Sequence, residues 1–99
     1  MSAADALEGI NPTIHAPNRL RICALLETAG EAEFAVVQQQ LGVSASVLSK
    51  QVSVLMSAGY VEQRKAVRDT RQRVWLTLSP EGRDAYREHL AALRAIVDS

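Results

Sequence analysis

The sequence has few of the residues that form disulfides and metal sites. Its 99 residues include one cysteine and two histidines. One cysteine excludes an internal disulfide, and with two histidines it cannot supply the four ligands of a closed zinc site. We therefore expect no metal and no other cofactor, in a reducing compartment such as the cytoplasm. Basic and acidic residues number eleven each, and this zero net charge excludes a uniformly basic protein that coats nucleic acid.

Long hydrophobic runs and catalytic motifs are also missing. The longest stretch without charge lies between Glu33 and Lys50, and its glutamines, glycine and serines exclude a bilayer span. The first ten residues carry Asp5 and Glu8 but no basic residue, so we expect no signal peptide and no membrane partner. The sequence has no glycine-rich phosphate loop, no spacing that groups Ser, His and Asp, and no paired carboxylates. An enzyme is therefore the least favoured class of function.

The composition is that of one globular domain, but the charge is unevenly placed. Apolar residues make up 47% and charged residues 22% of the chain. Residues 62–73 carry five basic side chains against two acidic ones, whereas residues 1–33 carry two against five. A local basic patch attracts phosphate without making the whole surface basic. A solvated, charged hairpin would have the same composition, so this alternative stays open.

Apolar spacing predicts two helices in the first half of the chain. The first follows Pro17, which suits a first helical turn, and ends before Gly30. A short helix is predicted over residues 35–41, ended by Gly42 in a left-handed backbone conformation. Phe34, between the two helices, is expected to anchor a short strand or loop.

A third helix is predicted from its N-cap, Ser44, to about residue 58. Its apolar stripe has spacings of four and three, and consists of Leu48, Val52 and Leu55. At about 100° per residue, the opposite face carries Ser46, Lys50, Ser53 and Ser57. That face is small, polar and nearly free of charge.

After this helix the apolar period changes to two. Residues 60–67 and 71–78 are predicted as the strands of a hairpin, with a polar turn at Arg68-Asp69-Thr70. Ser79-Pro80-Glu81 is a strong helix start, and the last helix runs to about residue 97. A helix-turn-helix followed by a basic hairpin favours DNA binding, with the second helix in the major groove and the hairpin on phosphates or in the minor groove.

With these elements in this order, the sequence resembles the winged helix-turn-helix transcription regulators of the MarR and ArsR type, in their small single-domain form. The segments that carry the resemblance are IHAPNRLRICALL, LSKQVSVLMSAGYV within residues 34–65, and LTLSPEGRDAY. The resemblance covers about residues 14–97. It implies a mainly α fold with a two-stranded β wing and an extra C-terminal helix.

The sequence predicts three parts of the chain, and the resemblance implies a function. Residues 1–15 would be a partly helical segment that contacts a dimer partner, residues 16–79 the DNA-binding core, and residues 80–99 a dimerisation helix. Members of this family bind double-stranded DNA as homodimers and regulate transcription. The third helix would be the recognition helix, and residues 62–73 would be the wing.

The candidate DNA-binding residues lie on these two elements. On the recognition helix they are Ser44, Ala45, Ser46, Val47, Ser49, Lys50 and Ser53, and in the wing they are Lys65, Arg68, Arg71 and Arg73. Arg64 is expected to pair with Glu62 or Asp69 instead. Because the helix face carries one cation and no arginine or asparagine, we expect specificity to come partly from thymine methyl contacts, from DNA shape and from wing arginines. The alternative is that Ser44 only caps the helix and the other side chains are solvated.

An apolar stripe on the last helix has two interpretations. It either closes the protomer's own core or forms a dimer interface with the N-terminal segment, and the length of the helix favours the dimer. The candidate interface residues are Leu7, Ile10, Ile14, Tyr86, Leu90, Leu93 and Val97.

The remaining distinctive residues are assigned structural roles. Cys23 lies on the apolar face of the first helix, which favours a core position over a redox sensor. Trp75 points away from its neighbours on the strand and is expected to pack on the open side of the hairpin or against a helix. His15 is expected to bind a backbone carbonyl, and no spacing groups it with His89 or Cys23.

A winged helix can also serve as a protein-interaction module, and the zero net charge keeps this alternative function open. Substitution of Arg71 and Arg73 would weaken DNA binding but leave a protein partner largely unaffected. The sequence does not identify an operator or a small-molecule effector.

Overall fold

The computed structural model describes residues 3–98, so residues 1–2 and 99 of the predicted terminal segments lie outside the described part. The elements, in chain order, are α1 (Ala3–Glu8), α2 (Pro12–His15), α3 (Pro17–Ala29), β1 (Glu31–Glu33), α4 (Phe34–Leu41), α5 (Ala45–Ser57), β2 (Val61–Arg68), β3 (Arg71–Leu78) and α6 (Pro80–Asp98). This is the predicted winged helix-turn-helix with an extra C-terminal helix.

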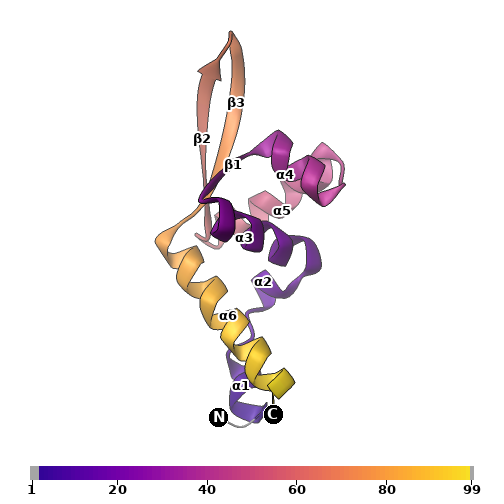
Figure 1. The fold of residues 1–99 in the computed structure, drawn as a ribbon, viewed down its shortest axis with the longest axis vertical. Coiled ribbons are helices and arrows are strands. Elements are labelled where there is room, and N and C mark those ends of the chain that lie inside the picture. The colour runs from indigo at the N-terminus through magenta and orange to yellow at the C-terminus, as the bar shows by residue number, and fades with distance from the viewer. Residues whose placement is uncertain (1–2, 99) are drawn as a thin grey trace.

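The molecule is elongated, 54 Å along its longest axis, and its two ends differ (Figure 1). The β2–β3 hairpin projects from one end, with α4 and α5 beside its base. At the other end, α1 packs against the C-terminal half of α6. The two ends therefore offer separate surfaces.

The sheet has three strands rather than the two predicted. Its order is β1-β3-β2, and β1 pairs antiparallel with β3, so that Ala32 faces Leu76. Both of these side chains are buried. A strand of three residues shows a period of two only once, so the sequence predicted no more than a short strand or a loop between α3 and α4. Phe34, expected to anchor a short strand or loop, directly follows β1, packs against the core and is the first residue of α4.

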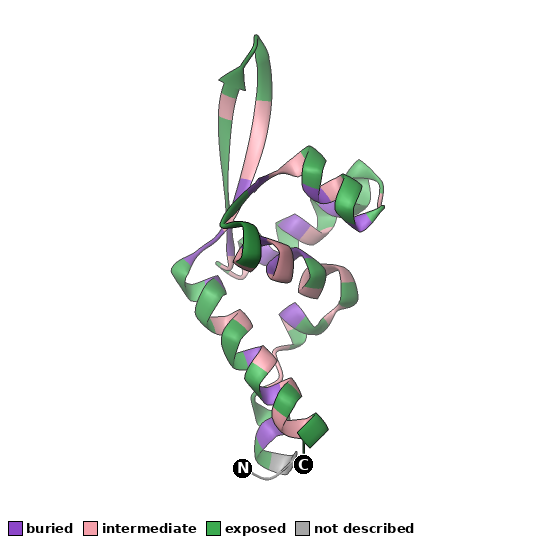
Figure 2. Cartoon of the chain, in the orientation of Figure 1, coloured by how far each residue is buried: buried purple, intermediate pink, exposed green. Residues whose placement is uncertain are grey.

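The core lies between the helices and the base of the sheet. Figure 2 shows buried residues at the base of the hairpin and along the inner faces of the helices, whereas the tip of the hairpin is exposed. The predicted stripe of α5 is confirmed, because Leu48, Val52 and Leu55 are all buried. Cys23 is completely buried in this core, as predicted.

The predicted turn between α4 and α5 is also confirmed. Gly42 has φ 67° and ψ 34°, a left-handed conformation that glycine adopts without the steric cost of a β-carbon. Its N–H donates to the carbonyl oxygens of Gln38 and Gln39, which ends α4. Ser44 Oγ accepts a hydrogen bond from Val47 N at 3.2 Å, which caps α5.

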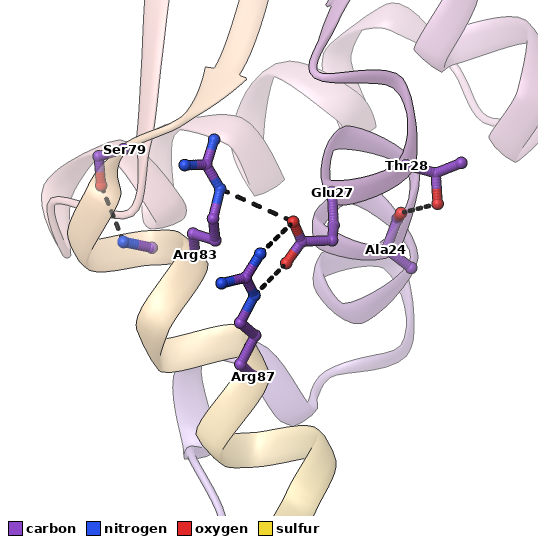
Figure 3. Close-up of polar contacts among 7 residues, drawn as sticks. Ala24, Glu27, Thr28, Ser79, Arg83 and Arg87 are labelled. Carbon is purple, nitrogen blue, oxygen red and sulfur yellow. Dashed lines mark hydrogen bonds and ion pairs between the residues drawn. The ribbon is translucent and has the colours of Figure 1, made fainter.

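The start of α6 is fixed against the end of α5. Ser79 Oγ accepts from Gly82 N at 2.9 Å and donates to the Gly59 carbonyl at 2.5 Å. Gly82 lies so close to Tyr60 that a β-carbon there would approach the Tyr60 carbonyl oxygen to 2.0 Å. One and two turns after Ser79, Arg83 and Arg87 of α6 reach Glu27 of α3, at 3.7 Å and 3.1 Å (Figure 3).

The N-terminal segment is held to α6 by a pair of histidines. The Asn11 backbone N–H donates to His89 Nδ1 at 3.0 Å, and His89 Nε2 lies 3.3 Å from His15 Nδ1. The expectation that His15 binds a backbone carbonyl is therefore wrong. The two histidines are 74 residues apart, and only the packing of α2 on α6 brings them together.

Candidate nucleic-acid interface

The outer face of α5 presents the predicted small polar side chains to solvent. Every recognition-helix candidate is exposed: Ser44, Ala45, Ser46, Val47, Ser49, Lys50 and Ser53. Ser44 Oγ and Ser46 Oγ lie 3.2 Å apart at the N-terminus of the helix. The first backbone N–H groups of a helix have no partner within it, so this end is suited to an anion such as phosphate. Lys50 is the cation of this face.

The wing is a long hairpin with a two-residue turn. Asp69 and Thr70 have φ values of 53° and 64°, as both central residues of a type I′ turn require. Arg68 and Arg71 face each other across the strands directly beside this turn, and Lys65 is opposite Val74. The wing tip, which we define as Lys65, Arg68 and Arg71, thus carries three exposed cations.

The two remaining arginines of the wing are held by β1. Arg64 Nη2 lies 2.8 Å from Glu31 Oε1, so the expected pairing of Arg64 with Glu62 or Asp69 is wrong. Arg73 Nη1 lies 2.7 Å from Glu33 Oε1, in a half-buried ion pair. A contact between Arg73 and DNA would have to break this pair. Within residues 3–98, no ion pair involves Lys65, Arg68 or Arg71, so their charges remain available.

Sequence reasoning missed the role of the two acids of β1. Glu31 and Glu33 lie 33 and 40 residues from their arginine partners, and both were counted only as part of an acidic N-terminal third. The sole available signal was their spacing of two around the small, apolar Ala32, which is a strand pattern of minimal length. These ion pairs neutralise the base of the wing and leave its tip positive.

The α4–α5 helix pair lies beside the base of the wing, away from the end formed by α1 and the C-terminal half of α6 (Figure 1). Together these elements have the architecture of a winged helix. They are a helix of the recognition type, a hairpin whose two-residue turn is flanked by arginines, and a third strand at the base of the hairpin. The family model described as winged helix DNA-binding domain matches residues 18–97. The chain belongs to this family. This membership, with the similar structures below, supports a DNA-binding transcriptional regulator.

Several solved structures share this winged helix. The transcriptional regulator homologue from Pyrococcus horikoshii OT3 is 26% identical, covers 95% of each chain and has a TM-score of 0.88. The transcriptional repressor BigR from Xylella fastidiosa is 25% identical, over 92% of this chain and 86% of that one, with a TM-score of 0.69. NadR, solved with 4-hydroxyphenylacetate, is 26% identical, over 96% of this chain and 67% of that one, with a TM-score of 0.75. These relatives are regulators of the MarR-like type, which confirms the resemblance seen in the sequence. No curated protein matches the chain.

The opposite end of the winged helix carries the candidate dimer residues. Val97 is 80% exposed and Leu7 is 62% exposed, although both are large and apolar. The half-buried members of the set are Ile10, Tyr86, Leu90 and Leu93. Ile14 is completely buried in the protomer's own core and offers no surface to a partner, so its assignment to the interface is wrong.

The packed face of α6 also differs from its predicted stripe. The buried residues of the helix are Gly82, His89 and Ala92, none of which belongs to the predicted stripe. The stripe is thus only partly used by the protomer's own core.

The other candidate sites of the chain are accounted for by packing. Burial raises the pKa of the Cys23 thiol to about 11, so this thiol is protonated and unreactive at neutral pH. Among the described residues, no three His, Cys, Asp or Glu side chains converge as metal ligands. None of the helices in residues 3–98 is both long and apolar enough to cross a membrane.

Proposed function

We propose that the chain binds double-stranded DNA as a homodimer and regulates transcription, with α5 in the major groove and the wing on phosphates or in the minor groove. The observation that carries the proposal is that Lys50 and the three cations of the wing tip are all exposed, on α5 and on the hairpin that α5 contacts at its base. A neutral protein with this distribution attracts phosphate locally.

The roles of the helix residues follow from their chemistry. Lys50 donates to guanine or phosphate oxygens, and the hydroxyls of Ser46 and Ser53 bond base edges or phosphates. Ala45 and Val47 offer apolar contact to thymine methyl groups. Because none of these contacts is bidentate, much of the specificity falls to DNA shape and to the wing.

The roles of the wing residues follow from their ion pairs. Lys65, Arg68 and Arg71 contact phosphates or the minor groove, since no carboxylate of the described residues holds them. Arg73 joins them only when DNA displaces Glu33. The dimer forms through the exposed parts of α1 and α6, which would present two copies of α5 to successive half-sites.

The test is DNA binding over a salt series, with DNA taken from upstream of the protein's own gene. For a dimer, the double variant R68A/R71A removes up to four phosphate contacts. The slope of log K against log salt should become shallower by about 3.6, at about 0.9 per phosphate. The matched control is Arg94→Ala, which removes an exposed arginine of α6; provided that sedimentation shows this variant to keep the mass of the wild type, it should leave the slope unchanged.

The outcomes separate the proposal from its alternative. A slope unaffected by the double variant would contradict the assignment of the wing tip to DNA. If the chain bound no DNA at low salt, the protein-interaction module would be the better interpretation.

A further inference from the structure

A groove opens between α3, α4, β1 and β3, away from the outer face of α5. Its volume is about 750 Å³, within the range of small-molecule sites. Its apolar walls come from Ala24 and Leu25 of α3, Val36 of α4 and Trp75 of β3. Val36 is 44% exposed, so part of the apolar wall of the groove is left uncovered by the protomer.

The polar groups of the groove select for positive charge. The carboxylates of Glu31 and Glu33 line it on the β1 side. The carbonyl end of α4 borders it at Gln40 and Leu41, where the helix dipole is negative. Arg21, the basic residue of the lining, turns its guanidinium to these carbonyls, at 3.3 Å and 3.2 Å, so its charge is already engaged.

One cation already occupies the edge of the groove. The guanidinium carbon of Arg64 lies 5.8 Å from the centroid of the Trp75 ring, within cation–π distance, while Nη2 of the same side chain pairs with Glu31. The protein's own side chain thus shows that the indole and the carboxylate together accept a positive group.

Arg64 is only weakly held in this position. The side chains of Arg64 and Glu31 are 56% and 39% exposed, and exposed ion pairs contribute little to stability. The neighbouring pair of Arg73 and Glu33 is more buried, at 32% and 16%, and therefore stays in place. A ligand cation that also covers apolar wall would replace Arg64 at Glu31 and Trp75.

We propose that this groove binds small organic cations with an aromatic body, the positive charge at Glu31 and Trp75 and the apolar body against Leu25 and Val36. Such a ligand satisfies the carboxylate and covers apolar surface, whereas an anion would face two carboxylates and a helix C-terminus. Because Arg64 belongs to β2 and Glu31 to β1, binding would break the contact that ties the wing strand to the groove.

The experiment titrates the protein with tetraphenylphosphonium and, separately, with tetraphenylborate, an anion of the same shape. The readout is the indole N–H signal of Trp75, the chain's one tryptophan, in ¹H–¹⁵N correlation spectra. We expect the cation to shift this signal with a Kd at least about tenfold below that of the anion. The assay contains no DNA, so its result does not depend on whether the proposed DNA binding is correct.

Two substitutions move the affinity in opposite directions. Glu31→Gln should raise the Kd of the phosphonium about tenfold, whereas Arg64→Ala should lower it about threefold, because it removes the competing guanidinium. Both side chains are exposed, so the fold is retained. Glu88→Gln and Arg94→Ala make the same changes in charge on α6 and should leave the Kd unchanged.

The results that would contradict the proposed cation site are also defined. Equal affinity for the two ions would show a merely hydrophobic surface, and equal effects of Glu31→Gln and Glu88→Gln would show general electrostatic attraction. Either result, or a Trp75 signal that the phosphonium does not shift, would overturn the proposal.

Discussion

His89 makes the stability of the protein depend on pH through a defined hydrogen-bond arrangement. The Asn11 backbone N–H can only donate, so His89 Nδ1 must carry a lone pair, and the ring proton sits on Nε2. That N–H points to His15 Nδ1, which accepts it. A second proton on His89 has no acceptor at Nδ1, and the ring is completely buried.

The sign and size of the effect follow from linkage. Burial, and secondarily the charge of His15, lowers the pKa of His89 in the folded state below its ordinary 6.5. The unfolded chain therefore binds the proton more readily, so the stability contributed by neutral His89 is complete above pH 6.5 and is lost as the pH falls. The limiting slope is about 1.4 kcal/mol per pH unit. Between pH 6.5 and pH 5.5 the loss is at most about 1 kcal/mol.

The measurement is urea unfolding at pH 7.5, 6.5 and 5.5, at one protein concentration, for the wild type and His89→Asn. The asparagine side-chain oxygen can accept the Asn11 N–H but does not titrate. The variant should be less stable at pH 7.5, because it loses the contact with His15 and leaves a cavity, but its stability should fall less between pH 6.5 and pH 5.5. Carboxylate titration is common to both proteins and cancels in the difference. If both proteins lost the same free energy over this interval, the assignment to His89 would be refuted.

Three further substitutions test the packing, the wing turn and the dimer. Gly82→Ala should destabilise the fold by about 1–3 kcal/mol, because its β-carbon would meet the Tyr60 carbonyl, whereas Asp84→Ala on the exposed side of α6 should change the urea midpoint little. Thr70→Gly should stabilise by up to about 1 kcal/mol, since a β-branched residue at φ 64° is strained; an unchanged or lower midpoint would argue against strain there. In sedimentation at micromolar concentration the chain should have about twice its mass of 10.8 kDa, and Val97→Asp should reduce this to the single-chain mass. A wild-type monomer would refute the dimer.

The elements that the sequence predicted well are those with a long periodic pattern or a chemically specific end. The stripe of α5 and its Ser44 cap are local features, decided within a few residues, and both were confirmed. The hairpin was predicted to within one residue because β3 shows apolar alternation at Val74, Leu76 and Leu78, and the polar turn fixes where its partner strand ends. β1 has three residues, and its existence depends on β3, which lies more than forty residues further along the chain.

The candidate site divides in the same way. Exposure of the α5 face followed from its helical period, without knowledge of any other element. The sequence could not predict which wing arginines lack an ion-pair partner, because the pairing depends on the acids that β1 brings to the base of the wing. The contact of His15 with His89 was missed for the same reason, since it requires the packing of α2 on α6.

The acids of β1 also explain how a chain of zero net charge can concentrate positive charge where phosphate would lie. Glu31 and Glu33 pair with Arg64 and Arg73 and so neutralise the positive charge at the base of the wing. The cations of the wing tip lie farther out on the hairpin, and no carboxylate of residues 3–98 pairs with them. Since salt screens exposed charges beyond about 8 Å at physiological ionic strength, the acids outside the wing weaken these cations little, and Asp69 in the turn offsets one of their three charges. Zero net charge is therefore compatible with strongly salt-dependent binding to DNA, provided that the wing tip makes the contacts.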